Sequence, residues 1–249
     1  MRNIDDVLHF REDISPFLVH LTRGTTSEGG IPAYDALRQI ITTMSLKPGR
    51  RLVSQARFGI WTMGLTDEQK SRYFSAICFT ETPLNEVHCL LDIAYRDIHL
   101  SQYGLVFLKD TLLQRGVSPV LQFNNIGGDK NSLIQALCSL IGTSPSEAEA
   151  FLPLISTFGK KIQAPGTATP PEGNLDFRWE REWRYPYAKG PLIFDPNDIF
   201  IGLCPDDRIS EFERLLPGVG FVDPVRNVKW YATKLLQARQ RLDIKFSVL

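Results

Sequence analysis

Short blocks of apolar and polar residues alternate along the chain, and their spacing switches between helical and strand periodicity. Leu37, Ile40, Ile41 and Met44 share one helical face and predict a helix over 32–46. Further helices are predicted at 66–74, 84–98 and 109–116, as a pair within 131–158, and at about 206–216 and 225–241. Strands are predicted at 16–23, 75–82, 103–107, 118–123, 176–186 and 198–203. This mixed order predicts a mixed α/β or α+β architecture, and we expect the α+β form, in which helices flank a mixed β-sheet.

Residues at the ends of the predicted helices support these bounds. The helix at 66–74 begins with an N-cap residue and an acidic first turn, and Gly116 is a good stop for the helix before it. Ser144 is expected to cap the second helix of the pair, with Pro145 in its first position. The stretch 160–174 is rich in Pro, Gly and Thr, and we expect a mobile loop or lid there within a single domain.

Composition narrows the function classes. The 249 residues include 28 Lys+Arg and 28 Asp+Glu, so any nucleic-acid contact would use a local patch. The four cysteines lack CxxC spacing and predict reduced thiols in a cytoplasmic protein; they are Cys78, Cys89, Cys138 and Cys204. The first residues lack an apolar segment and no run of 18 apolar residues occurs, so we expect neither a signal peptide nor a membrane span.

Two of the predicted strands carry candidate site residues. In 16–23, His20 and Thr22 share one face and Arg23 follows at the end. In 75–82, one face holds only small residues, which are Ala76, Cys78, Thr80 and Thr82. His20 is either a hydrogen-bonded histidine near a sheet end or part of a site, and the small face accommodates either a closely packed helix or a ligand.

The predicted strand at 176–186 alternates aromatic and charged side chains. Its aromatic face holds Phe177, Trp179, Trp183 and Tyr185, and its charged face holds Arg178, Glu180, Glu182 and Arg184, with Arg181 interrupting the parity. One interpretation is a solvated face of cross-strand ion pairs. The other is a catalytic carboxylate that the aromatic rings desolvate and the arginines keep ionised.

Four segments resemble the AbiGi family of abortive phage-resistance proteins. They are HLTR, CFTETPL, YGLVFLKDTLLQRGVSPVLQF and DFRWEREWR, and the resemblance covers roughly residues 9–205 in the same order. The run YG…F.K…G..PV is its most specific part. The family is often labelled as the antitoxin of an abortive-infection pair, which implies a toxin or antitoxin protein as partner.

The order of motifs also resembles that of ADP-ribosyltransferases, which carry three signatures on the strands of a split β-sheet. His20-Leu21-Thr22, Thr80-Glu81-Thr82 and Glu180-Arg181-Glu182 fall in that order. The middle motif departs from the family, since it lacks a tyrosine and the Ser-Thr-Ser form. The resemblance implies a split sheet flanked by helices, NAD as substrate, and a protein or nucleic-acid acceptor of ADP-ribose.

The same resemblance assigns roles to individual residues. Glu182 would be catalytic, with Glu180 as the other candidate, because a carboxylate stabilises an oxocarbenium-like transition state. His20 and Thr22 would hold the adenosine side of NAD, and Thr80 and Thr82 would line the nicotinamide pocket. Arg23 would contact the diphosphate.

The sequence lacks the residue patterns of several other kinds of functional site. Neither a Rossmann nor a Walker glycine motif occurs, the histidines form no zinc-type set, and the Asp cluster of a nuclease is missing. A Cys78–His20 nucleophile pair would lack a third residue to orient the histidine.

The segment 225–245 is basic. It either packs Trp230, Leu235 and Leu236 on the core with a solvated charged face, or contacts RNA, DNA or an acidic partner. Two functions from different classes follow for the chain: an ADP-ribosyltransferase toxin, or a catalytically silent antitoxin or binding protein.

Overall fold

The computed structural model describes residues 14–24, 30–49, 64–91, 93, 99–124, 132–160, 174–175 and 178–244. The chain forms two compact units. Unit 1 comprises Met1–Ser45, Phe79–Arg115 and Ile193–Leu249, and unit 2 comprises Leu46–Cys78 and Gly116–Leu192. The chain passes between the units within β2 (Ser45–Leu46), β3 (Ala76–Thr80) and β10 (Leu192–Ile193), and between Arg115 and Gly116. The single domain expected from the sequence stays a prediction.

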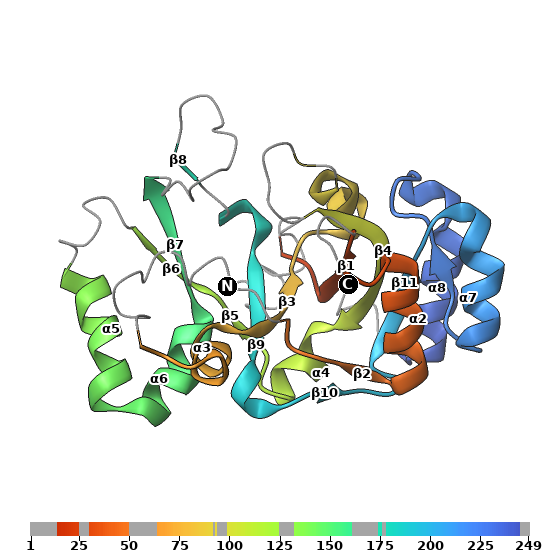
Figure 1. The fold of residues 1–249 in the computed structure, drawn as a ribbon. Helices are drawn as coiled ribbons and strands as arrows, with labels where there is room; N and C mark the ends of the chain where they lie inside the picture. The colour runs from red at the N-terminus through yellow and green to blue at the C-terminus, as the bar shows by residue number, and fades with distance from the viewer. Residues whose placement is uncertain are drawn as a thin grey trace, which may run out of the picture. The chain divides into compact units, whose positions relative to one another are not determined.

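Unit 1 is built on a mostly antiparallel sheet with the strand order β12-β11-β4-β1-β3 (Figure 1). Its other strands are β1 (Phe17–Arg23), β4 (Leu100–Leu108), β11 (Ile199–Leu203) and β12 (Phe221–Val222). Only the β11–β12 pair is parallel among the pairs described in this unit. The strand at 16–23 and the extended core of 103–107 are confirmed, and the fold is mixed α+β with helices flanking the sheet.

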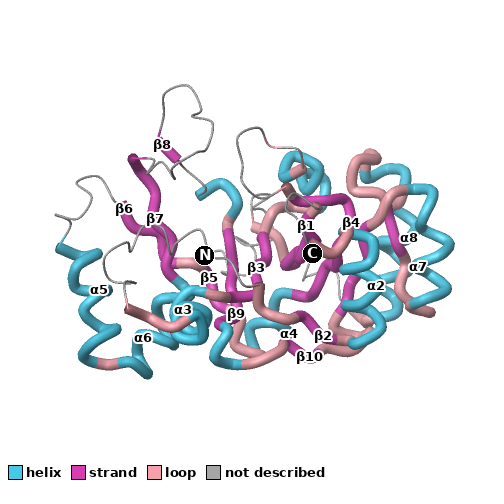
Figure 2. The backbone as a smooth tube through the Cα atoms, in the orientation of Figure 1, coloured by secondary structure: helices cyan, strands magenta, loops and turns pink. Residues whose placement is uncertain are grey.

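Side chains of β1 alternate between two cores. The face carrying Phe17, Val19 and Leu21 packs against the 3₁₀ helix η3 (Leu84–Leu90) and against α8 (Ala232–Arg241). On the opposite face, α2 (Ala33–Thr43) packs against β1 and β4, and α7 (Ile209–Leu215) packs against α2 and β12 (Figure 2). There the ring of Phe212 contacts the rings of Tyr103 and Phe221. Helix α4 (Lys109–Gln114) follows β4, and η8 (Asp206–Arg208) and η9 (Val228–Trp230) precede α7 and α8.

Gly202 is required by the packing of β12 over β11. A Cβ at this position would lie 2.0 Å from the ring of Phe221, which is fully buried and stacks on Phe212. The ring therefore occupies the space that any other residue at position 202 would need.

Unit 2 combines three helices with short strands. Helices α3 (Asp67–Phe74), α5 (Ser132–Thr143) and α6 (Pro145–Phe151) and the 3₁₀ helix η5 (Leu152–Leu154) enclose a small core. Strand β7 (Ile155–Lys160) pairs in parallel with β6 (Leu121–Asn124) and antiparallel with β8 (Asn174–Leu175). In the same unit, β5 (Ser118–Pro119) pairs antiparallel with β9 (Glu182–Pro186), which is flanked by η6 (Arg178–Glu180) and η7 (Tyr187–Lys189).

Several element predictions are wrong. The helix pair ends at Phe151 and the chain then becomes strand β7, because Ile155 is fully buried beside Leu121 of β6. Pro145 does occupy the first helical position, but Ser144 makes no side-chain cap hydrogen bond in the described structure. The helix from 84 is a 3₁₀ helix that ends at Leu90. Most of the predicted loop or lid at 160–174 lies outside the described residues.

The predicted strand at 176–186 is also shorter than expected. Arg178–Glu180 form a 3₁₀ turn, and Arg181 takes a left-handed backbone conformation with φ of 46°. The alternation of faces therefore fails: Trp179 is 47% exposed and Arg184 is buried. In α8, Leu235 packs on the core as expected, but Leu236 is exposed, as is Trp230 of η9. Within the described residues, no helix combines the length and apolarity that a membrane crossing needs.

Candidate functional site

Thr22 is held in a closed set of hydrogen bonds inside unit 1. Its hydroxyl donates to the Tyr103 carbonyl at 2.9 Å and accepts from Ser101 Oγ at 2.8 Å, while Ser101 Oγ accepts from the Tyr103 amide at 3.2 Å. Thr22 is buried. This hydroxyl therefore ties β1 to β4, and both of its hydrogen-bonding functions are engaged within the protein.

His20 lies on the same face of β1 as Thr22, as the sequence predicts. Its ring lies 5.6 Å from the ring of Phe79, and the residue is half-buried. Arg23 is exposed at the end of the strand, beyond a register shift between Leu21 and Arg23. A histidine beside an aromatic ring at this position fits both interpretations given to it from the sequence.

Thr80 lies on the other face of the sheet. It is directly opposite Val19 in the β1–β3 register, so its side chain shares the face of Val19 and not that of His20. Thr80, which the resemblance assigns to the nicotinamide pocket, therefore lies on the face opposite His20 and Thr22, which it assigns to the adenosine side of NAD. The face of Val19 is covered by η3, whose Val87 and Leu90 are buried in the same cluster.

Thr80 and Thr82 bond to each other. Their hydroxyls are 2.7 Å apart, and the Thr82 amide donates to Thr80 Oγ1 at 3.2 Å. Both residues are buried. Their polar atoms thus stabilise the turn that leaves β3.

Between them, Glu81 forms a buried ion pair that sequence reasoning missed. Lys109 Nζ donates to Glu81 Oε1 at 2.8 Å and to the Ser15 carbonyl at 2.7 Å. The side chain of Glu81 is 7% exposed and that of Lys109 is 17% exposed. Both residues fall in the segments quoted for the AbiGi resemblance, but the sequence gives no signal that they meet.

Glu182 and Arg184 form a bidentate ion pair in unit 2. Arg184 Nε and Nη2 donate to the two carboxylate oxygens of Glu182 at 2.9 and 2.8 Å. Arg184 Nη1 donates to the carbonyls of Pro153 and Ile155 at 2.9 and 3.0 Å. Burial alone would lower the pKa of Arg184, but the Glu182 carboxylate and the Cys78 sulfur raise that pKa above the ordinary arginine value.

This geometry contradicts the interpretation of the charged residues as a solvated face. Glu182 and Arg184 do form an ion pair, but Arg184 is 4% exposed and cannot lie on a solvated face. Glu180 and Glu182 belong to unit 2, whereas His20, Thr22, Arg23, Thr80 and Thr82 belong to unit 1. That Glu182 and His20 act on one NAD molecule, as the ADP-ribosyltransferase resemblance implies, stays a prediction.

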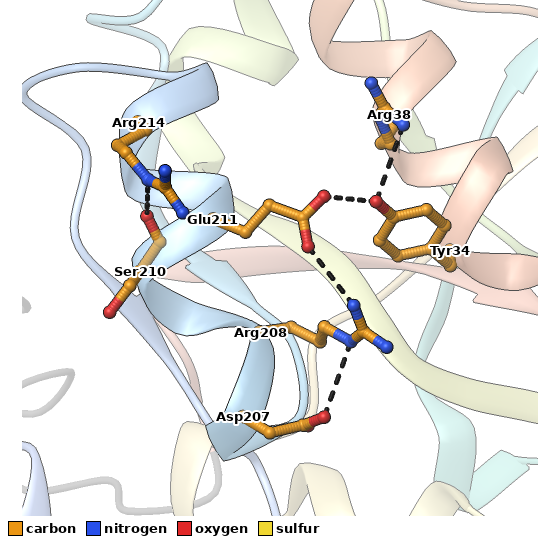
Figure 3. A network of polar contacts seen from close by, with 7 residues as sticks. All are labelled: Tyr34, Arg38, Asp207, Arg208, Ser210, Glu211 and Arg214. Atoms are coloured by element: carbon orange, nitrogen blue, oxygen red, sulfur yellow. Dashed lines mark hydrogen bonds and ion pairs between the residues drawn. The ribbon is translucent and has the colours of Figure 1, made fainter.

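A further polar network joins α2 to α7 in unit 1 (Figure 3). Tyr34 donates its hydroxyl to Glu211, and Arg208 donates to the other oxygen of Glu211 at 3.4 Å. The guanidinium groups of Arg38 and Arg208 lie 5.6 and 5.5 Å from the centre of the Tyr34 ring. The hydrogen bond with Glu211 raises the pKa of Tyr34, and the same bond lowers the pKa of Glu211.

Arg208 pairs with the carboxylate of Glu211, and Arg38 donates to the Tyr34 hydroxyl, so the network is suited to joining two helices. Arg208 also pairs with Asp207 at 3.4 Å, and Arg214 donates to the Ser210 carbonyl. Sequence reasoning did not single out these residues; the i,i+4 spacing of Tyr34 and Arg38 was the available signal.

Neither comparison with known proteins nor a search for metal-binding groups assigns a function to these residues. No protein-family model matches the chain, and neither a curated protein nor a solved structure matches it. In the part of the chain that the structure describes, no group of three His, Cys, Asp or Glu residues is placed to hold a metal ion.

Proposed function

We propose that this protein is a catalytically silent binding protein, the antitoxin of an abortive-infection pair. The observation that carries the proposal is the bidentate ion pair between Glu182 and the buried Arg184. The AbiGi resemblance supplies the biological setting, in which the partner is a toxin protein.

The ion pair argues against catalysis by Glu182. A carboxylate that stabilises an oxocarbenium-like transition state acts through its negative charge, which must reach the ribose. Here a guanidinium occupies both oxygens, and two backbone carbonyls fix that guanidinium in place. Breaking such a buried pair costs on the order of 3 kcal/mol, so the pair is expected to persist.

The unit 1 motifs point the same way. The hydroxyls of Thr22, Thr80 and Thr82 are buried and bonded within the protein. Thr80 is also on the sheet face opposite His20. Groups that would hold the two ends of NAD are therefore engaged in stabilising the sheet.

An ADP-ribosyltransferase that uses NAD as substrate is the second candidate. Two of its expected site residues are partly exposed to solvent, which favours this function: His20 is half-buried, and the side chain of Glu182 is 18% exposed. In this function Glu182 would be catalytic and Arg23, exposed at the end of β1, would contact the diphosphate.

The test combines an NAD assay with a growth assay. The purified chain, alone and with cell extract, should neither consume labelled NAD nor label any fraction. Cells expressing the protein encoded next to this chain should regain growth when the chain is co-expressed. Glu182→Gln loses the buried ion pair, so it should rescue to the extent that it stays folded, which circular dichroism checks. NAD-dependent labelling that Glu182→Gln lowers about a hundredfold would overturn the proposal in favour of the transferase.

A further inference from the structure

An exposed tryptophan stands at the start of the C-terminal helix of unit 1. Trp230 is 78% exposed, and Val225 in the same loop is 51% exposed. Burial of such a side chain would stabilise an interface by removing apolar surface from water. Val225, Arg226, Lys229 and Trp230 are called the Trp230 surface below.

The loop that presents Trp230 is ordered by its own hydrogen bonds. The buried Asp223 accepts from the Val225 amide at 3.0 Å and, through its other oxygen, from the Asp206 amide at 3.2 Å. Asn227 caps the 3₁₀ turn by accepting from the Lys229 amide at 3.0 Å. Tyr231, the next residue, is buried in the core. The backbone that carries the tryptophan is therefore ordered before any partner arrives, which lowers the entropy cost of binding.

Cations surround the exposed ring. The Arg226 guanidinium lies 5.6 Å from the centre of the Trp230 ring, and Lys229 is exposed. Arg226 has an acidic neighbour, Asp206 at 3.5 Å, but both side chains are at least half exposed and the pair contributes little. Residues 224–242 contain five Lys or Arg and no Asp or Glu; the five are Arg226, Lys229, Lys234, Arg239 and Arg241.

Two of these basic residues bond to other parts of the protein. Lys234 pairs with Glu213, and Arg241 donates to the carbonyls of Pro196 and Phe200. The cations left at the tryptophan are Arg226 and Lys229. Two cations beside two apolar side chains suit a protein surface better than a nucleic-acid backbone, which would meet Asp206 and Asp207 close by.

We propose that the Trp230 surface docks a partner protein that offers an apolar pocket rimmed by Asp or Glu side chains. This inference rests on the proposed binding function and names its docking surface. Trp230 fills the pocket, and Arg226 and Lys229 pair with the acidic rim. Tryptophan and arginine are the residue types that most often dominate binding at protein interfaces.

The experiment measures binding of the protein encoded next to this chain by calorimetry. Trp230→Ala should weaken binding at least about thirtyfold, since a central tryptophan typically has that effect. Trp179→Ala, which removes the exposed tryptophan of unit 2, is the matched control and should bind like the wild type. Lys229→Glu should weaken binding about tenfold at low salt and reduce its salt dependence, whereas Lys47→Glu at another exposed site should not.

The other outcomes separate the two proposals. Equal binding by Trp230→Ala and the wild type overturns the docking surface and leaves the proposed function standing. If the wild type does not bind the neighbour-encoded protein, both fail. Trp230-dependent binding of a single-stranded oligo(dT) probe, or Trp230-dependent self-association in ultracentrifugation, would overturn the inference in favour of nucleic acid or a second copy of the chain.

Discussion

At Gly104, β4 approaches β1 so closely that no side chain fits. A Cβ there would lie 2.4 Å from the His20 carbonyl oxygen and 3.0 Å from a methyl group of Leu21. We expect Gly104→Ala to lower the free energy of unfolding by about 2 kcal/mol, because the clash is with backbone that cannot rotate away. Urea denaturation measures this. Gly24→Ala is the control, since its Cβ would have no neighbour closer than 3.7 Å; equal stabilities of the two variants would contradict the argument.

The positions of the candidate site residues depend on the pattern within one strand in some cases and on distant segments in others. His20 and Thr22 share a face because both lie on one strand, where parity alone decides. The face of Thr80 depends on the register between β1 and β3, which the pattern within a single strand does not determine. Arg184 is buried because carbonyls at 153 and 155, thirty residues earlier in the chain, accept its hydrogen bonds. Charge alone predicts an exposed arginine there.

Among the elements, α3 begins with a complete capping box. The Gln69 amide donates to Thr66 Oγ1 at 3.2 Å, and the Thr66 amide donates to the Gln69 side chain at 2.9 Å. Thr66→Ala should lower the free energy of unfolding by about 1 kcal/mol, because two helix-end amides lose their partners or their geometry. Thermal unfolding tests this against Thr42→Ala, which removes an exposed threonine from within α2. A loss no larger than that of the control would exclude the box as a stabilising feature.

Element predictions succeeded where the local pattern is strong. The capped start of α3 and the apolar face of α2 appear in the structure. They failed where pairing with a distant strand overrides local preference. The sequence predicts that the helix continues through Ile155, but Ile155 pairs with β6 and belongs to a strand. At 178–186 the alternation of aromatic and charged residues predicts one continuous strand. In the structure, the left-handed backbone of Arg181 separates a 3₁₀ turn from the shorter strand β9.

At the scale of the molecule, acidic groups kept neutral in the folded state concentrate in unit 1. Burial raises the pKa of Cys204 to about 12 from 9.0, and burial is also the largest cause that raises the pKa of Tyr103 and Tyr231. The pKa of Tyr34 is raised mainly by its hydrogen bond with Glu211. All four residues belong to unit 1, so alkaline pH should act on this unit through several groups at once.

The sign of the effect follows from proton binding. In the folded state Cys204 keeps its proton up to about pH 12, whereas the unfolded thiol loses it near pH 9.0. Between these values the unfolded state binds fewer protons, so stability falls as pH rises, by at most about 1.4 kcal/mol per pH unit for one group. Below pH 9.0 the contribution is fully present. Tyrosines with raised pKa values add a loss of the same sign above their ordinary value of 10.0.

We therefore expect the stability curve of Cys204→Ala to fall less steeply than that of the wild type between pH 9 and pH 10.5. Replacing the buried thiol leaves a small cavity, but that cost does not change with pH, so the slope isolates the titration. Urea denaturation at half-unit steps of pH gives both slopes. Cys89→Ala removes an exposed thiol and should keep the wild-type slope. Parallel curves for Cys204→Ala and the wild type would mean that the Cys204 proton is not linked to folding, and the alkaline loss would then belong to the tyrosines alone.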